Sequence, residues 1–187
     1  IIEVGYRGHK NKDSYLGEFY YLTKNNLKNI KSKIGKNKKL SIMIDTKDWS
    51  NPKELKDNLK DCKKIVDIIR FAVNPKKINN LEKFLNETKK MGFNIAVNLM
   101  YSHLLLKNDY LIKSILKLKK YFNIIYIVDS YGTLISNDVK RIIEKIRFLD
   151  PQILIGFHAH NNLEMALSNS IEAMDNKIDY LDSTFTG

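Results

Sequence analysis

Seven short apolar runs alternate with segments of helical periodicity along the whole chain, and this alternation limits the folds open to it. The runs lie at residues 1–6, 40–45, 68–73, 94–99, 124–129, 153–158 and 178–182. They are rich in Ile, Val and Leu, which is typical of parallel strands that helices cover on both faces. We therefore predict an α/β protein.

The helical segments carry start and stop signals. Asn51, Pro52 and Glu54 occupy the cap, first-turn and capping-box positions of one helix, and Gly92 stands where another helix should end. The lysine-rich run 31–39 is expected to end a helix near Gly35, whereas residues 13–26 give no clear pattern. Apolar stripes at helical spacing are formed by Leu81, Phe84, Leu85 and Thr88, by Leu111, Ile115, Leu118 and Phe122, and by Val139, Ile142, Ile143 and Ile146.

A TIM (β/α)8 barrel accounts better for this alternation than a doubly wound open sheet. No Gly-x-Gly-x-x-Gly turn follows the first strand, and the sequence has no other phosphate-binding glycine loop. A complete barrel takes about 250 residues, whereas this chain has 187 and opens inside a predicted strand. We predict one barrel domain over residues 1–187, holding strands two to eight, with the first strand and the C-terminal part missing.

His158 and His160 form a His-Ala-His pair at the end of the sixth apolar run. In a strand, residues i and i+2 point to the same side, so both imidazoles would converge at the C-terminal end of the strand. Asn161 and Asn162, which are favoured helix caps, then precede a helical pattern that begins at Leu163. The pair is a candidate metal site, and the alternative is one buried core histidine beside a solvent-facing one.

Composition narrows the classes of partner. The net charge of +11 comes almost entirely from lysines spread over predicted helix faces, which indicates a solvated surface, so we expect no nucleic-acid partner. Cys62 is the single cysteine, which excludes an intrachain disulfide, and we expect an inert, half-buried thiol. No signal-peptide pattern or bilayer-spanning apolar run is present, so we expect a cytoplasmic protein without a membrane partner.

Arg70 lies inside an apolar run, and a buried guanidinium needs a partner. It either binds an acidic group of a substrate or forms an internal ion pair with Glu3 or Asp45. Both interpretations stay open at the level of the sequence.

Five segments resemble the metal-dependent lyases and aldolases related to hydroxymethylglutaryl-CoA (HMG-CoA) lyase and isopropylmalate synthase, and especially the 4-hydroxy-2-oxovalerate aldolases. The Gly-x-His-x-His-Asn-Asn segment, followed by Ala166, Asn169 and Ser170, is the most specific of them. All five fall in order at successive strand ends. They are residues 2–7 (Ile-Glu-Val-Gly-Tyr-Arg), 98–103 (Asn-Leu-Met-Tyr-Ser-His), 128–132 (Val-Asp-Ser-Tyr-Gly), 156–162 and 179–187.

The resemblance implies a barrel that binds one divalent metal, Mn²⁺ or else Mg²⁺ or Zn²⁺, with His158 and His160 as ligands. The family's third ligand is the aspartate of an Asp-Arg-(Asp/Glu)-Gly motif on the first strand, and its base is a nearby histidine; neither lies within this sequence. Such a metal acts as a Lewis acid on a chelated 2-oxo acid and stabilises the enolate formed when the adjacent carbon–carbon bond breaks or forms. We therefore expect residues 1–187 alone to be inactive.

Other strand-end residues are weaker catalytic candidates. Asp129 ends the fifth run and Ser130 follows it, where catalytic residues of barrels concentrate, and Ser130 and Gly132 could donate to a substrate carboxylate. A helix-cap or turn role is the alternative for this segment. Ser102 and His103 match the aldolase pattern, although His103 could simply line the mouth. Three loop aromatics would either shape a pocket or pack in the core or rim: Trp49, Tyr101 and Tyr131.

Three functions follow from the resemblance. The Asp-Ser-x-Gly and Tyr-Ser-His segments favour an aldolase that cleaves a 4-hydroxy-2-oxo acid to pyruvate and an aldehyde. The alternatives are a Claisen-type enzyme that uses an acyl-CoA and a non-catalytic barrel scaffold. The expected ligand is a small 2-oxo acid, and the possible protein partners are a second copy of the chain or an aldehyde dehydrogenase.

Overall fold

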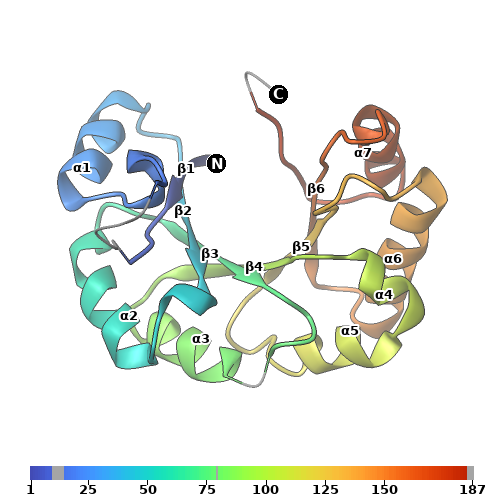
Figure 1. Cartoon of the computed structure of the whole chain (residues 1–187), viewed down its shortest axis with the longest axis horizontal. Coiled ribbons are helices and arrows are strands. Elements are labelled where there is room, and N and C mark those ends of the chain that lie inside the picture. Colours follow the sequence, from blue (N-terminus) through green and yellow to red (C-terminus); the bar gives the residue numbers. More distant parts are fainter. Residues whose placement is uncertain (10–14, 79, 185–187) are drawn as a thin grey trace. The chain divides into compact units, whose positions relative to one another are not determined.

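The computed structural model describes residues 1–9, 15–78 and 80–184, in which strands alternate with helices (Figure 1). The strands are β1 (Ile2–Tyr6), β2 (Leu40–Asp45), β3 (Ile68–Val73), β4 (Asn94–Leu99), β5 (Ile124–Val128), β6 (Leu154–His158) and β7 (Tyr180–Leu181). The α-helices are α1 (Lys24–Lys33), α2 (Pro52–Leu59), α3 (Leu81–Lys90), α4 (His103–Lys107), α5 (Asp109–Leu116), α6 (Ser136–Leu149) and α7 (Ala166–Asp175). Short 3-10 helices lie at η1 (Glu18–Tyr20), η2 (Thr46–Asp48) and η3 (Lys60–Cys62).

The strands are hydrogen-bonded to one another in the order in which they occur in the chain. β2 pairs in parallel with β1 and β3, and β6 pairs in parallel with β5 and β7. A doubly wound sheet would require the strand order to reverse, so the chain order favours the barrel type of sheet. The predicted parallel α/β fold is confirmed, and its strand order is that expected of part of a TIM barrel.

The chain divides into two compact units. The first comprises Ile1–Ala72 and Asn79–Ala96, and the second comprises Val73–Ile78 and Val97–Gly187. Within each unit, helices lie along one side of the strands (Figure 1). The expectation of a single domain stays a prediction.

The two faces of the first unit's sheet differ in chemistry. Ile42 and Ile44 of β2 are fully buried and lie in register with Ile69 and Phe71 of β3, which makes one continuous apolar face. The intervening residues point to the other face because side chains alternate along a strand. On that face Arg70 lies in register with Met43, and Glu3 with Ser41.

Four helices follow the sequence signals closely. Asn51 Oδ1 accepts a hydrogen bond from Glu54 N at 3.0 Å, and Pro52 is the first residue of α2, as the capping pattern predicts. The predicted stripes of α3 and α6 are buried, and Gly92 follows α3 with a φ of +89°. The lysine-rich run also ends a helix as expected, since α1 stops at Lys33.

One predicted stripe and one predicted helix start were partly wrong. α5 ends at Leu116, so Leu118 and Phe122 lie in the turns that follow it. α7 begins only at Ala166, because the preceding residues form turns and Asn161 Oδ1 accepts a hydrogen bond from Ala166 N at 3.0 Å. The buried side chains of α7 are Asn169 and Ala173. Four large apolar residues of the predicted helical pattern lie at the surface: Leu163, Leu167, Ile171 and Met174.

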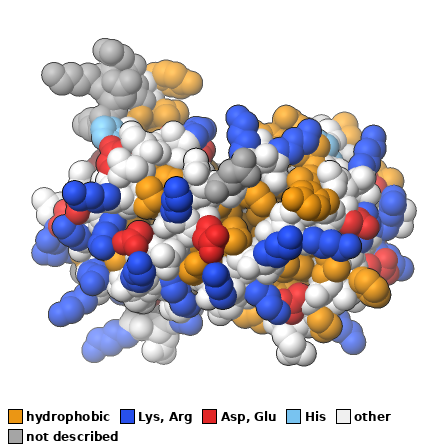
Figure 2. All heavy atoms as spheres, turned by 90° about the horizontal axis from the view of Figure 1, so that it is seen from below, with side chains coloured by type: hydrophobic (Ala, Val, Ile, Leu, Met, Phe, Trp, Pro, Cys, Tyr) orange, Lys and Arg blue, Asp and Glu red, His pale blue; other side chains and the backbone are white. Residues whose placement is uncertain are grey.

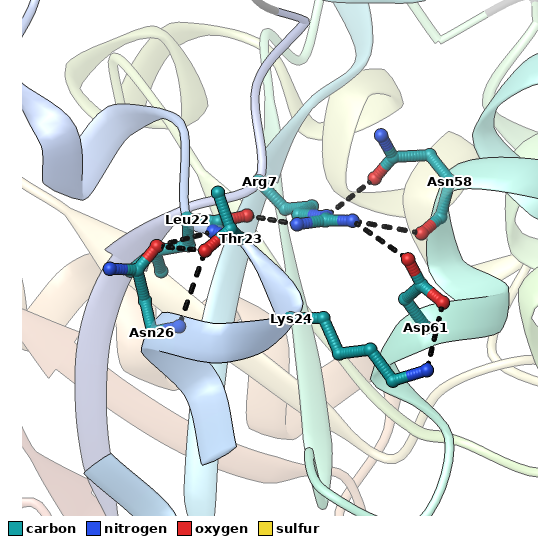
Figure 3. A network of polar contacts seen from close by, with 7 residues as sticks. All are labelled: Arg7, Leu22, Thr23, Lys24, Asn26, Asn58 and Asp61. Carbon is teal, nitrogen blue, oxygen red and sulfur yellow. Dashed lines mark hydrogen bonds and ion pairs between the residues drawn. The ribbon is translucent and has the colours of Figure 1, made fainter. Parts of the chain in front are cut away.

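A polar network organises residues 22–26 of the segment without a clear sequence pattern, whose residues 13 and 14 lie outside the described residues (Figure 3). Arg7, just after β1, donates from Nε to Asn58 Oδ1 at 2.7 Å and from Nη1 to the carbonyl of Leu22. Thr23 and Asn26 then form a capping box at the start of α1. Arg7 therefore ties the end of β1 to both α1 and α2 through contacts between distant parts of the chain.

The charged surface matches the expectation from composition. Figure 2 shows lysine and arginine side chains scattered among acidic and apolar ones on the face that it draws. Several lysines contact carboxylates, including Lys119 with Asp150 at 2.6 Å and Lys31 with Asp67 at 2.6 Å. In the part of the chain that the structure describes, we find no helix with the length and apolar character needed to cross a bilayer.

Candidate metal centre

His158 and His160 lie side by side at the carboxyl end of β6, within the second unit. Their ring centroids are 5.0 Å apart and the ring planes are inclined by 76°. His158 is the last residue of β6, and its side chain is 32% exposed, while His160 lies two residues further on and is exposed. The predicted convergence of the two imidazoles at a strand end is therefore present.

The backbone fixes the tautomer of His160. Its Nδ1 lies 2.7 Å from the carbonyl oxygen of Asp129. A carbonyl oxygen only accepts hydrogen bonds, so Nδ1 must carry the proton in this contact. In the neutral ring the lone pair then resides on Nε2, which is the form in which imidazole binds a metal.

A carboxylate does the same for His158. Its Nδ1 lies 2.9 Å from Asp182 Oδ2, and Asp182 itself is anchored by a hydrogen bond from its N to Phe157 O at 3.0 Å. A carboxylate that accepts from Nδ1–H leaves Nε2 as the lone-pair nitrogen. Metal-binding histidines usually have such an outer partner, which orients the ring and raises its basicity.

These two histidines fit a divalent metal. Each has its Nδ1 engaged and its Nε2 left for coordination, and imidazole is a common ligand of such ions. Within residues 1–9, 15–78 and 80–184, no group of three or more His, Cys, Asp or Glu side chains is placed to hold a metal. The described residues therefore offer two candidate ligands, His158 and His160, at this strand end.

Asp129 supports this pair through the loop after β5. It is buried, its Oδ1 accepts from Thr133 N at 3.0 Å, and its Oδ2 accepts from Leu134 N at 3.1 Å. The carboxylate thus closes the turn while the carbonyl of the same residue accepts from His160. These hydrogen bonds are the turn role that the sequence left open, and the Asp129 carbonyl also orients His160. The catalytic role of Asp129 stays a prediction.

Gly132 allows the loops after β5 and β6 to approach closely. Its φ is +60°, and a Cβ at this position would lie 2.7 Å from Asn162 N and 2.9 Å from His160 O. The left-handed conformation favours glycine, and the close approach of the two loops leaves no room for a Cβ. Asn162 Nδ2 adds a hydrogen bond to Tyr131 O at 2.7 Å, so the backbone around the histidine pair is held from both sides.

Ser130 joins the ends of β4 and β5. Its Oγ accepts a hydrogen bond from Tyr101 N at 2.9 Å. The neighbouring Ser102 is buried, and its Oγ accepts from Val128 N and donates to Leu99 O. His103 is the first residue of α4, so the second unit places all of its predicted site residues at the carboxyl ends of β4, β5 and β6.

Arg70 belongs to the first unit, where it is 4% exposed and its Nη1 lies 3.1 Å from Glu3 Oε2. The ion pair with Glu3, one of the two alternatives for this residue, is thus present. Trp49 is buried, so packing is its role rather than shaping a loop pocket. Cys62 is fully buried rather than half-buried, and burial raises the pKa of its thiol to about 11, which agrees with an inert cysteine.

Asp182 is the site residue that the sequence did not single out. It follows β7, and only the pairing of β7 with β6 brings its carboxylate to His158. The sequence did offer one indication of a role in the site. Asp182 is the last residue of the last predicted strand and lies within a segment that resembles the aldolases.

A parallel sheet in chain order, with two oriented histidines at a strand end, is the arrangement of barrel-type proteins that carry their site at the carboxyl ends of the strands. Comparison of the sequence with family models gives the particular family. Residues 74–187 match the HMGL-like model, and the chain belongs to the HMGL-like family.

Curated relatives are lyases at modest identity. The chain is 32% identical over 123 residues to oxaloacetate decarboxylase of Mycobacterium tuberculosis (strain ATCC 25618 / H37Rv), which covers 65% of this chain and 36% of the relative. It is 32% identical over 129 residues to 4-hydroxy-2-oxovalerate aldolase of Geobacillus genomosp. 3, which covers 68% and 37% respectively. Each alignment thus spans little more than a third of the relative's length.

Solved structures share the fold. The N-terminal domain of a Bacteroides vulgatus protein assigned as an aldolase superposes with a TM-score of 0.89 and 32% identity, covering 99% of this chain and 60% of that one. The carboxyl transferase domain of Rhizobium etli pyruvate carboxylase, with pyruvate and biocytin, gives a TM-score of 0.74 at 16% identity over 87% of this chain and 29% of that one. The second likeness concerns the fold alone.

Proposed function

We propose that this chain contributes two metal-binding histidines to a divalent-metal-dependent carbon–carbon lyase that cleaves a 4-hydroxy-2-oxo acid to pyruvate and an aldehyde. The observation that carries the proposal is the hydrogen bonding of the two imidazole rings. Both Nδ1 atoms are bound to acceptors, Asp182 Oδ2 and Asp129 O, so both Nε2 atoms are available as ligands. Aldolase and decarboxylase relatives support the reaction class.

Each nearby residue has a defined task in this proposal. His158 and His160 would hold the metal, which when bound supplies Lewis acidity to the 2-oxo group of the substrate. Asp182 and Asp129 keep the rings in the ligating tautomer. Ser130 Oγ already accepts from Tyr101 N, but a hydroxyl also has its own proton, which it would donate to the substrate carboxylate.

We infer that β1 to β7 correspond to the second to eighth strands of a TIM barrel. In the resembling enzymes the third metal ligand, an aspartate, and the histidine base come from the strand before the equivalent of β1. Mn²⁺ is our first choice of metal, before Mg²⁺ and Zn²⁺. An aldehyde dehydrogenase that consumes the released aldehyde stays a predicted partner.

Decarboxylation of a 2-oxo diacid is the second candidate function. The relative from Mycobacterium tuberculosis is named oxaloacetate decarboxylase and is 32% identical to this chain. Both reactions break the bond to C3 of a 2-oxo acid and leave pyruvate. The two functions therefore require the same metal site and differ in the group that leaves.

Pyruvate release tests the proposal. The full-length protein containing residues 1–187 is stripped of metal, reloaded with Mn²⁺, Mg²⁺ or Zn²⁺, and assayed with 4-hydroxy-2-oxovalerate and with oxaloacetate. We expect metal-dependent pyruvate release from the hydroxy acid, while release from oxaloacetate alone would favour decarboxylation. Folded, metal-loaded protein that releases pyruvate from neither substrate would refute both, and CoA release from an acyl-CoA with a 2-oxo acid would indicate the Claisen alternative.

A further inference from the structure

Three aromatic side chains gather at the carboxyl ends of β4 and β5: Tyr101, His103 and Tyr131, which we call the aromatic cluster. The centroid of the Tyr131 ring lies 5.4 Å from that of Tyr101 and 5.4 Å from that of His103. The ring planes are tilted by 43° and 37°, respectively. Tyr131 is thus the centre of the cluster, and it is 52% exposed.

The backbone beneath the cluster is fixed. Tyr101 has a φ of +57°, which is uncommon for a bulky residue and persists only where the surroundings hold it. The hydrogen bond from Tyr101 N to Ser130 Oγ holds it, and Asn162 Nδ2 holds the carbonyl of Tyr131 at 2.7 Å. An exposed group on a fixed backbone is preorganised, so little ordering cost opposes the binding of a ligand to it.

The loop that carries Tyr131 is the loop that supports the histidine pair. Asp129, two residues before Tyr131, accepts the hydrogen bond from His160 Nδ1, and Gly132, one residue after it, packs against the His160 carbonyl. The loop after β5 therefore carries Tyr131 and also contacts the segment that holds His160. Aromatic rings bind other rings and apolar groups through offset or tilted contacts like those within the cluster.

We infer that the aromatic cluster binds the part of the substrate remote from its 2-oxo acid, and that this part is an aromatic group rather than a methyl group. The inference rests on the proposed lyase function and deepens it, because it names the class of aldehyde released. In the synthetic direction, C3 of pyruvate loses a proton and bonds to the aldehyde carbon, and the aldehyde oxygen gains a proton to become the 4-hydroxyl.

Aldehyde preference in the synthetic direction tests this inference. The full-length, metal-loaded protein is assayed with pyruvate and either benzaldehyde or acetaldehyde. We expect kcat/KM to favour benzaldehyde, and the Tyr131→Ala variant to lose about tenfold of that preference, the scale on which apolar pockets discriminate. The Tyr131→Phe variant keeps the ring and should keep the preference. Tyr110→Ala removes another exposed tyrosine, on α5, and should leave the preference unchanged.

A binding measurement separates failure of this inference from failure of the proposed function. Benzyl alcohol is an unreactive aromatic probe, and its saturation-transfer NMR signal with the full-length protein reports contact without catalysis. If no aldehyde reacts but the signal is lost in Tyr131→Ala, the lyase proposal fails and the aromatic site stands. If acetaldehyde is preferred, or if Tyr131→Ala changes neither the preference nor the signal, the inference is overturned.

Discussion

The carboxylate of Asp182 sets the tautomer of His158. Without an acceptor at Nδ1, the proton of a neutral imidazole is free to sit on either nitrogen, and only one tautomer presents Nε2 to a metal. Asp182 Oδ2, at 2.9 Å from His158 Nδ1, selects that tautomer. Asp182 is not itself a candidate ligand, yet it sets the tautomer in which His158 would bind a metal.

The Asp182→Asn variant should therefore bind metal more weakly. An asparagine can turn its NH2 group toward Nδ1, which favours the tautomer with the proton on Nε2. We expect a loss of about 10–100-fold in affinity for Mn²⁺, measured by calorimetric titration of the full-length protein. Asp175→Asn, at the exposed end of α7, is the matched control. Equal affinity in both variants would remove Asp182 from the site.

Asp150 offers a test of electrostatics away from the site. It is buried after α6, and the hydrogen bond from Lys119 Nζ at 2.6 Å, helped by backbone N–H groups, lowers the pKa of its carboxyl against the opposing effect of burial. A carboxyl with a lowered folded-state pKa stabilises the fold above its unfolded pKa, and this stability is lost as the pH falls through the folded value.

Asp150→Asn should consequently lower the free energy of unfolding by about 1–3 kcal/mol at neutral pH. The difference from the parent protein should shrink once the pH drops below about 3.9, the ordinary pKa of aspartate. Denaturant unfolding at several pH values measures it. A deficit that stayed constant down to acidic pH would show that the ionised carboxylate is not what stabilises this position.

Among the elements, the loops after β5 and β6 matter most, because they connect regular structure to the candidate ligands. Gly132→Ala would place a methyl group 2.7 Å from Asn162 N at a φ of +60°. We expect a cost of about 1–3 kcal/mol in stability together with weaker metal binding, because His160 lies against this glycine. Gly35→Ala, where a Cβ meets nothing within 4 Å, is the control. Thermal melts and metal titrations that do not distinguish the two variants would contradict this account.

Elements whose signals are local were predicted from the sequence. The buried strands are mostly apolar, and the stripes of α3 and α6 face the core, so hydrophobic pattern located these elements. α7 was misjudged because its burial follows another rule. Asn169 is buried through a hydrogen bond from Nδ2 to Leu134 O, whereas Leu167 and Ile171 are exposed.

The residues of the candidate site also fall into two groups, those with a local sequence signal and those placed by contacts between distant strands. The His-Ala-His spacing predicted His158 and His160 because the alternation of a strand is local. Asp182 could not be assigned, since its contact with His158 depends on the register of β7 against β6. The sequence left Asp129 with two roles, because a carboxylate before a Gly-containing turn suits both catalysis and capping.

At the scale of the whole molecule, the two compact units differ in what they contribute. The second unit carries the histidine pair, the supporting loops and the aromatic cluster. The first unit carries the buried Arg70–Glu3 pair and the Arg7 network (Figure 3). Measurements on the first unit can therefore report on folding without touching the candidate ligands.

Cys62 provides such a measurement. The thiol is fully buried, and burial raises its pKa to about 11, so it should not react with a thiol reagent at pH 8 while the first unit is folded. Labelling should rise only in denaturant, in step with the loss of circular dichroism. Rapid labelling in native buffer would show that this region opens locally, and addition of Mn²⁺ should not change native labelling.

The central claim is that His158 and His160 together hold a divalent metal. Its most direct test is the metal content and Mn²⁺ affinity of the full-length protein and its His158→Ala and His160→Ala variants, with His9→Ala, a histidine of the first unit, as control. We predict that each of the two site variants loses most of its bound metal while its melting temperature without metal stays near that of the parent, and that His9→Ala keeps its metal. Unchanged metal content in both His158→Ala and His160→Ala would contradict the account.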